Sequence, residues 1–164
     1  MKAIILAAGC SSRLGNKFED MPKGLVDING KSIIQRQITL FHEKKIDDII
    51  IVTGPNSDKF NFKDVTYVKD QNYREHEVLG SLMATKNLMN TEIIMTYSDI
   101  LFDKAILDQV LNFQGDIGVS TEMNWLSTYQ NRIHHPLSQA DNVLINYGKI
   151  TEIRKNMAGY LKSE

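Results

Sequence analysis

Residues 4–26 read IILAAGCSSRLGNKFEDMPKGLV, and this stretch decides both the fold and the first functional question. It begins as an apolar run, passes through small residues to Gly9, and then reaches two cations, Arg13 and Lys23. An apolar run that ends in a glycine loop is typical of a buried strand followed by a turn. Small residues let ligand atoms approach backbone N–H groups, and the two cations indicate an anionic ligand, with phosphate the first candidate.

The same alternation of short apolar runs and longer amphipathic segments continues along the chain. Strands are expected at residues 2–8, 47–54, 65–70, 91–99 and 116–121, with 91–99 as the central one. Helices are expected at residues 32–45, 78–89 and 103–113, the last opened by Asp103 as N-cap, and a hairpin is expected at 142–153. Alternating strands and helices predict a three-layer, Rossmann-like α/β fold with a mixed, mostly parallel sheet and a C-terminal β-hairpin.

Bulk properties narrow the class of protein. A chain of 164 residues is expected to form a single domain, residues 1–164. Its net charge of −1 and the lack of a Lys/Arg block argue against partners such as nucleic acid or a membrane surface. The single cysteine, Cys10, rules out an internal disulfide and fits a reducing compartment, and the N-terminal apolar run is too short to span a bilayer. We therefore expect a cytoplasmic protein, and the sequence leaves a homodimer open.

The glycine loop matches neither common phosphate-binding template. A P-loop starting at Gly9 would need its second glycine one position before Gly15, and the dinucleotide pattern fails at Ser11. The loop still has groups that can bind phosphate. Ser11 and Ser12 add hydroxyl donors, and the guanidinium group of Arg13 can donate to two phosphate oxygens. A tight strand-to-helix turn with a surface arginine is the alternative interpretation. In parallel sheets ligands bind at the carboxyl ends of strands, where both Gly9 and Ser98–Asp99 fall.

Five spaced elements resemble the signature of the nucleotidyltransferases that make activated sugars and polar head groups. These elements are Leu6-Ala7-Ala8-Gly9, Arg13, Pro22-Lys23, a short strand with Gly30-Lys31, and the following helix. The resemblance implies that the backbone of Leu6, Ala7, Ala8 and Gly9 holds the base and ribose, with Arg13 and Lys23 as catalytic cations on the triphosphate. It also implies that Gly80 and Ser81 lie against the base. An ordinary exposed lysine at position 23, and a helix start capped by Ser81, stay open as alternatives.

Asp99 follows a predicted strand where the resemblance places a metal-binding aspartate. Mg²⁺, the implied cofactor, prefers hard oxygens and often takes one or two carboxylates together with substrate phosphates. Many members read Gly-Asp at this point, whereas this chain reads Ser98-Asp99. A simple turn cap is the alternative role for Asp99. Because the acceptor itself supplies the attacking oxygen in such a reaction, Cys10 is expected to be a passive loop residue.

The segment from Trp125 onward carries the information about the acceptor. Trp125, Tyr129 and Arg132 are spaced four and three apart, so in a helix they would share one face, as an aromatic cage or anion clamp or as ordinary packing. Together with His135-Pro136 and the hairpin, this segment is similar to nucleotidyltransferase domains attached to phosphoenolpyruvate phosphomutases and to bacterial phosphocholine cytidylyltransferases. That resemblance implies CTP and a small acceptor such as phosphocholine or 2-aminoethylphosphonate. His134 and His135 are adjacent, which is poor geometry for one metal ion.

One missing feature leaves the function open at this point. The family usually brings a second metal-binding aspartate from a later strand, whereas no aspartate follows Asp141 here, so the domain is expected to be C-terminally truncated relative to the family. The alternatives are a sugar-1-phosphate nucleotidyltransferase and a non-catalytic nucleotide-binding domain. A nucleotidyltransferase of the molybdenum-cofactor type shares the first motif, but residues 125–140 do not suggest it.

Overall fold

The structure is a computed structural model, and it describes residues 1–9, 21–129 and 137–155. The chain divides into two compact units, Met1–Asn112 and Phe113–Glu164, and each is described here by itself. Within the described residues, no helix is long and apolar enough to cross a membrane.

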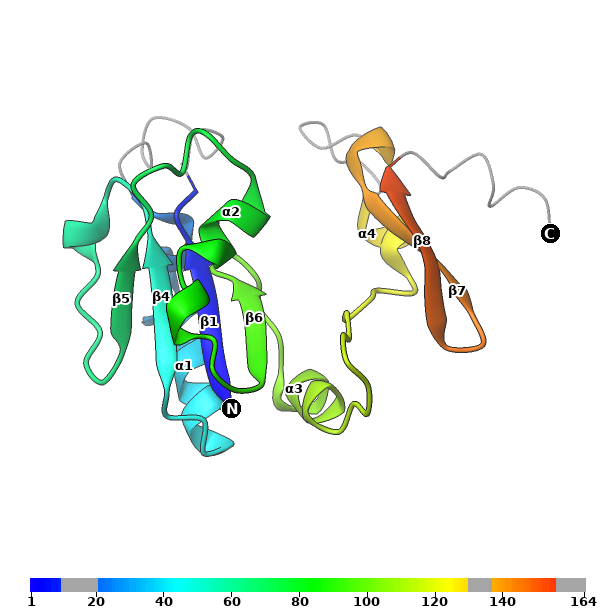
Figure 1. Cartoon of the computed structure of the whole chain (residues 1–164), viewed down its shortest axis with the longest axis horizontal. Helices are drawn as coiled ribbons and strands as arrows, with labels where there is room; N and C mark the ends of the chain where they lie inside the picture. The colour runs from blue at the N-terminus through cyan, green and yellow to red at the C-terminus, as the bar shows by residue number, and fades with distance from the viewer. Residues whose placement is uncertain (10–20, 130–136, 156–164) are drawn as a thin grey trace. The chain divides into compact units, whose positions relative to one another are not determined.

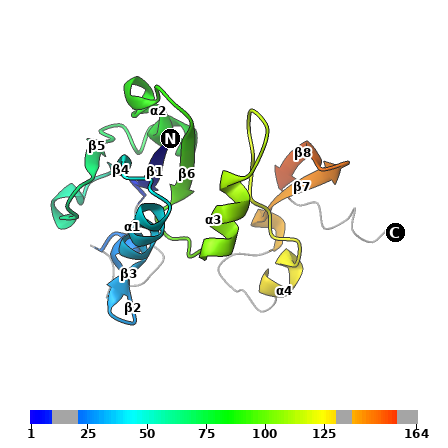
Figure 2. The same cartoon turned by 90° about the horizontal axis from the view of Figure 1, so that it is seen from below.

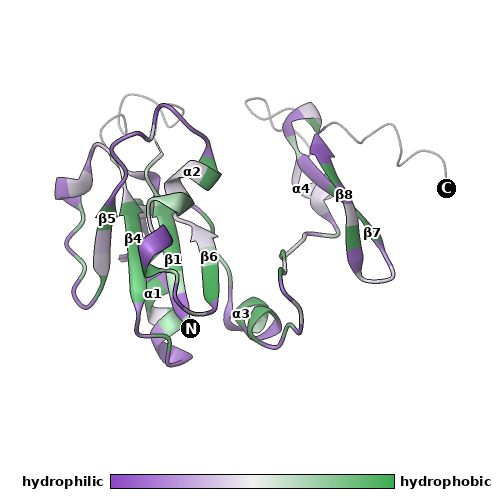
Figure 3. Cartoon of the chain, viewed as in Figure 1, coloured by the Kyte–Doolittle hydropathy of each residue, from purple (hydrophilic) through white to green (hydrophobic). Residues whose placement is uncertain are grey.

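The first unit is built on a four-stranded parallel sheet (Figure 1). Its strands are β1 (Lys2–Ala7), β4 (Ile49–Thr53), β5 (Thr66–Lys69) and β6 (Ile93–Tyr97), in the order β5-β4-β1-β6. Apart from Lys2 at the start of β1 and Thr53 at the end of β4, these two strands are apolar (Figure 3), and they are buried along almost their whole length. Parallel strands covered on both faces need such continuous apolar runs, which explains why these two segments form the middle of the sheet.

Helices cover both faces of this sheet (Figure 2). On one face lie α1 (Ile33–Glu43) and α3 (Lys104–Leu111), whose apolar side chains pack with Ala3, Ile5 and Ile49. On the other face, α2 (Val78–Met83) and the short helix η4 (Lys86–Leu88) cover Ile4, Leu6 and Ile50. The result is a three-layer α/β unit.

Side-chain caps fix where the two longer helices begin. The Ser32 hydroxyl accepts from the Gln35 backbone N–H at 3.2 Å, and the Asp103 carboxylate accepts from the Ile106 N–H at 3.0 Å. These bonds satisfy N–H groups that have no partner inside a helix. The N-cap role expected for Asp103 is therefore confirmed.

Shorter elements connect β1 to α1 and β4 to β5. The helix η2 (Lys23–Leu25) leads into a small hairpin of β2 (Asp27–Ile28) and β3 (Lys31–Ser32), and η3 (Ser57–Lys59) follows β4. The hairpin turns at Asn29 and Gly30, which have φ of 52° and 81°. Both central residues are left-handed, as in the tight turns that match the twist of paired strands.

The second unit holds α4 (Trp125–Tyr129), η5 (Leu137–Gln139) and an antiparallel hairpin. The hairpin consists of β7 (Asp141–Asn146) and β8 (Lys149–Lys155). Its turn residues, Tyr147 and Gly148, have φ of 48° and 73°, again the left-handed pair that favours a two-residue turn.

The fold class expected from the sequence is confirmed: an α/β parallel sheet followed by a C-terminal hairpin. Two expectations are wrong in detail. The strand β6 lies at the end of the four-stranded sheet instead of its centre, and it is only partly buried. Residues 116–121 form no strand, and Ile117 is 86% exposed, because an apolar alternation gives a strand only where a partner supplies hydrogen bonds.

Candidate active site

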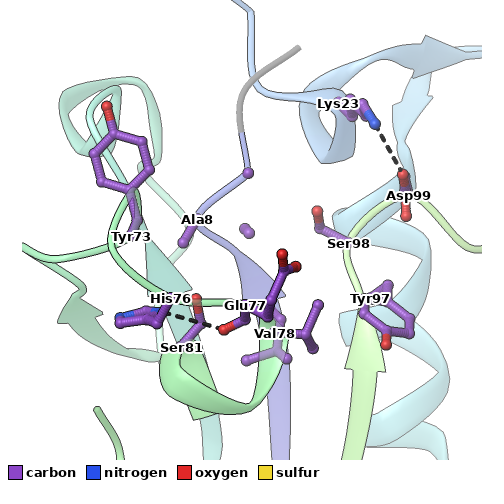
Figure 4. Close-up of a pocket in the computed structure, with 13 residues that line it drawn as sticks. Ala8, Lys23, Tyr73, His76, Glu77, Val78, Ser81, Tyr97, Ser98 and Asp99 are labelled. Atoms are coloured by element: carbon purple, nitrogen blue, oxygen red, sulfur yellow. Dashed lines mark hydrogen bonds and ion pairs between the residues drawn. The ribbon is translucent and has the colours of Figure 1, made fainter. Parts of the chain in front are cut away.

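The strand order reverses between β1 and β6, so a crevice is expected at the carboxyl ends of these two strands. The chain runs outward from β1 to β4 and β5 and then returns to the other side of β1 as β6. Loops on the two sides of such a switch point diverge, and ligands of open α/β sheets bind in the gap between them. A pocket lies at this place, formed by the ends of β1 and β6, by η2 and by the start of α2 (Figure 4).

The pocket brings together most of the residues singled out in the first unit. Its lining consists of Leu6, Ala7, Ala8, Gly9, Lys23, Tyr73, His76, Glu77, Val78, Ser81, Tyr97, Ser98 and Asp99. Positions 6–9, 23, 81 and 99 are far apart in sequence, and each was expected at a nucleotide or metal site. Gly80 lines a neighbouring shallow pocket instead.

Lys23 and Asp99 form an ion pair at the mouth of the pocket (Figure 4). The Lys23 Nζ lies 3.4 Å from Asp99 Oδ2, and the two side chains are 30% and 44% exposed. Solvent screens a pair this exposed, so it adds little to the stability of the fold. Its partial exposure keeps both charges accessible to a ligand.

Close packing brings the backbone at Lys23 against the end of β6. Ser98 donates its backbone N–H to Leu6 at 3.0 Å, which extends the β1–β6 ladder one residue beyond the strand. Gly24 is buried against it: a Cβ built there would lie 2.8 Å from Ser98 Cβ and 2.6 Å from Ile34 Cδ1. Position 24 must therefore be glycine while position 98 carries a side chain, and the two charged neighbours are held together.

Gly9 is open toward the pocket. A Cβ built on it would meet no atom of the described residues within 4 Å, and its φ does not lie in the left-handed region. Neither packing nor backbone conformation within the described residues requires glycine here. Among the described residues, no atom covers Gly9 on the side of the pocket, so its backbone can be approached closely from there.

A buried carboxylate anchors the side of the pocket formed by α2. Asp70 is 3% exposed and accepts from the Ser81 hydroxyl at 2.8 Å and from the Asn72 N–H at 3.1 Å. The His76 Nε2 lies 3.2 Å from the same carboxylate, and its Nδ1 lies 3.1 Å from the Glu77 carbonyl oxygen. Buried carboxylates require such partners, so this network fixes the loop between β5 and α2.

Two assignments on α2 change in the light of this network. Ser81 does not cap the helix, because α2 begins at Val78 with Glu77 as its N-cap, and the Ser81 hydroxyl goes to Asp70. Gly80 packs against His76: a Cβ at position 80 would collide with the Cγ of the His76 ring. Glycine at position 80 thus gives the His76 ring its place in the loop.

Several predicted site residues cannot be placed at this pocket. Arg13, Arg132 and Cys10, together with Ser11, Ser12 and the two adjacent histidines, lie outside the described residues. Trp125 and Tyr129 belong to the second unit, where their rings pack edge to face with centroids 5.8 Å apart. Their spacing on one helical face is as expected, and their role toward an acceptor stays a prediction.

Tyr73, His76 and Glu77 line the pocket but were missed from the sequence. They come from the irregular segment before α2, where no periodicity marks a buried side. The Glu77 side chain points into the pocket between Val78 and the Lys23–Asp99 pair (Figure 4). No spacing in the segment YREHE marks these three side chains as pocket lining.

The donors present suit a magnesium ion that arrives with phosphate ligands. The pocket offers the carboxylates of Asp99 and Glu77 and the hydroxyl of Ser98, all hard oxygen donors. Among the described residues, no three His, Cys, Asp or Glu side chains cluster as a closed metal site. Mg²⁺ commonly takes one or two protein carboxylates and completes its shell with substrate phosphates and water, so a closed cluster is not required.

The parallel sheet has helices on both faces and a pocket at its switch point. These features define the class of protein as a three-layer α/β domain. The chain belongs to the MobA-like NTP transferase domain family, which matches residues 3–157. Its fold agrees with solved structures: it aligns with the inositol-1-phosphate CTP transferase from T. maritima at a TM-score of 0.68. That alignment covers 96% of this chain and 64% of the other at 18% identity.

Curated relatives include cytidylyltransferases. The chain is 26% identical to CTP:phosphoglutamine cytidylyltransferase of Campylobacter jejuni, over 98% of this chain and 68% of that protein. It is 36% identical to choline-phosphate cytidylyltransferase of Streptococcus pneumoniae, over 62% of this chain and 46% of that protein. The solved CTP:phosphocholine cytidylyltransferase of Streptococcus pneumoniae aligns at a TM-score of 0.51 and 33% identity, covering 61% of this chain and 50% of that one. The chain therefore spans about half to two thirds of these relatives.

Proposed function

We propose that the protein is a magnesium-dependent cytidylyltransferase that moves CMP from CTP onto a small phosphorylated or phosphonate acceptor and releases pyrophosphate. The observation that carries this proposal is that one pocket is lined both by the Lys23–Asp99 pair and by Ala7, Ala8 and Gly9. Membership of the NTP transferase family supports nucleotidyl transfer, and relatives named for CTP and phosphorylated acceptors support the choice of substrates. Phosphocholine and 2-aminoethylphosphonate are the proposed acceptors.

The reaction is one displacement at phosphorus. An acceptor phosphate or phosphonate oxygen bonds to the α-phosphorus of CTP, and the bond from that phosphorus to the bridging oxygen of pyrophosphate breaks. No covalent bond to the protein forms, so the residues must orient two anions and compensate the charge that moves to the leaving group.

Each residue of the pocket has a distinct role in this proposal. Asp99, with Glu77 as the second available carboxylate, would hold Mg²⁺, which when bound withdraws charge from phosphate oxygens. Lys23 would leave its ion pair with Asp99 for the phosphate oxygens, joined by Arg13. The backbone at Ala8 and Gly9 would support the nucleotide, because among the described residues no atom lies within 4 Å of a Cβ built on Gly9. Trp125, Tyr129 and Arg132 are the proposed acceptor contacts.

The test is pyrophosphate release with Mg²⁺ across the four nucleoside triphosphates, each with phosphocholine, 2-aminoethylphosphonate or glucose-1-phosphate. The proposal expects release with CTP and one of the first two acceptors. Release only with the sugar phosphate would favour a sugar-1-phosphate nucleotidyltransferase. Binding of a triphosphate without any release would favour a non-catalytic nucleotide-binding domain.

A further inference from the structure

Gln37 is a polar residue on the buried, apolar side of α1. Its neighbours on that side are Ile33, Ile34, Ile38 and Phe41, and Gln37 itself is 1% exposed. A polar side chain in such a place needs hydrogen-bond partners, since a buried unpaired group is costly. Its partners lie in the turn that carries Asp99.

The amide nitrogen of Gln37 bridges the two ends of that turn. Its Nε2 donates to the backbone oxygen of Tyr97 at 2.8 Å and to that of Ile100 at 2.7 Å. Residues 98 and 99 form the turn between these two carbonyls, and the turn's own closing bond, from Ile100 N–H to Tyr97 O, is long at 3.4 Å. The two Gln37 bonds are therefore the shorter restraints on the backbone that carries Asp99.

The choice of glutamine is not explained by packing. Its Oε1 is buried and has no hydrogen-bond partner among the described residues. An apolar side chain of the same length would fill the space on α1 without leaving that oxygen unpaired. The amide is useful only for its two donors, and both are directed at the turn.

We propose that Gln37 is a positioning residue for Asp99: it fixes the turn at residues 97–100 so that the Asp99 carboxylate is held in the pocket. The inference rests on the proposed function in its catalytic consequence, because Asp99 is the proposed metal ligand. It also has a purely structural consequence, the rigidity of this turn. The two consequences can be measured separately.

The informative substitution is Gln37→Met, which keeps the length of the side chain and removes both donors. The matched control is Gln35→Met, the same change two residues earlier on the exposed side of α1. We expect the melting temperature of Gln37→Met to change by no more than about 4 °C, because the unpaired Oε1 is lost together with the two bonds. Gln37→Leu, which also removes both donors, serves as a second variant if Gln37→Met does not fold.

Amide hydrogen exchange over residues 97–101 reports on the turn without any turnover. We expect at least about tenfold faster exchange there in Gln37→Met and wild-type exchange in Gln35→Met, because exchange follows local opening. Steady-state kinetics report on the site: kcat should fall at least about tenfold, since small misplacements of a reacting group cost this much or more. The Mg²⁺ concentration for half-maximal rate should rise, and KM for CTP should change little.

Unchanged exchange at residues 97–101 in a folded Gln37→Met variant would overturn the proposal. Faster exchange with wild-type kcat and Mg²⁺ dependence would overturn it equally, because the turn would then be irrelevant to the site. A wild-type protein without turnover would count against the proposed function, and exchange would then decide the positioning role alone.

Discussion

Lys23 and Asp99 are residues of opposite charge that pair in the lining of the pocket, where Glu77 adds a second carboxylate. Lys23 is the only lysine or arginine in the described lining of the pocket, and Asp99 is its partner at 3.4 Å. An anion that binds Lys23, together with a cation that binds Asp99, would replace this pair with two stronger contacts. In the proposed mechanism, the free protein would therefore keep both groups close to the metal–triphosphate complex.

Removing either charge tests this arrangement. We expect Lys23→Ala and Asp99→Ala each to lower kcat by at least about 100-fold, as loss of one preorganised electrostatic contact does in other enzymes. Because the pair is exposed to solvent, the melting temperature should stay near that of the wild type. Lys63→Ala, at an exposed lysine, is the matched control and should keep full activity. Normal turnover in either site variant would remove the residue from the mechanism.

The hydrogen-bond polarity of the Ser81 hydroxyl bears on which base the pocket would prefer. Its hydroxyl hydrogen is committed to Asp70, so its oxygen can offer only lone pairs to a ligand. If Ser81 faces the base, as the family resemblance implies, this polarity suits the amino group of cytosine better than the carbonyl oxygen of uracil.

Asp70→Asn tests this polarity. The asparagine can donate to Ser81 and free its hydroxyl hydrogen, so we expect the preference for CTP over UTP in kcat/KM to fall at least about tenfold, or about 1.4 kcal/mol. Competition between the two nucleotides in pyrophosphate release measures it. Asp58→Asn, at an exposed aspartate, controls for the chemical change. An unaltered preference in folded Asp70→Asn would contradict the argument.

At the scale of elements, the site depends on how closely η2 approaches α1 and the end of β6. Gly24 makes this contact possible, whereas a Cβ built on Gly9 would meet no atom of the described part of the chain within 4 Å. The two glycines therefore predict opposite outcomes for the same substitution.

Gly24→Ala should destabilise the protein by about 1–3 kcal/mol, the usual cost of overpacking a core, and should lower kcat because Lys23 or Asp99 must shift. Gly9→Ala should leave stability unchanged and weaken nucleotide binding, because the new methyl group occupies ligand space. Urea unfolding and nucleotide titration of both variants provide the comparison. Equal stability of the two variants would show that the contact at Gly24 is not tight.

Some elements of the fold could be predicted from the sequence, and others could not. The runs at β1 and β4, the stripe of α1 and the Tyr147–Gly148 turn carry their structure in local periodicity and turn chemistry, so the sequence alone predicted them. The position of β6 at the edge of the sheet could not be predicted, because an apolar segment does not indicate whether a strand pairs on one side or on both. Lys23 and Asp99 were predicted through a family resemblance, and their contact across 76 positions required the fold.

The roles of Asp70 and Gln37 were missed for a different reason. Each acts through hydrogen bonds to groups far along the chain or in an irregular loop, which no spacing rule encodes. For Gln37 a signal did exist, since it interrupts the apolar stripe of α1 between Ile34 and Phe41. A polar residue in such a stripe indicates a specific partner in the core.

At the scale of the whole molecule, nucleotide binding should stabilise the fold. A ligand that binds only the folded state at 100 times its Kd adds about 2.7 kcal/mol to the free energy of unfolding. We expect MgCTP to raise the melting temperature of the wild-type protein and to have a much smaller effect on Lys23→Ala. A shift of equal size in both would place the nucleotide elsewhere.

Phosphorus NMR of the reaction can show whether the chain transfers a nucleotidyl group, because it identifies the products themselves. CTP and Mg²⁺ are incubated with phosphocholine or 2-aminoethylphosphonate, and the products are identified by their phosphorus resonances. We expect a CMP–acceptor anhydride and pyrophosphate in equal amounts with one of these acceptors, and neither product with Asp99→Ala. Unreacted CTP with both acceptors, or CMP released without a joined product, would contradict it.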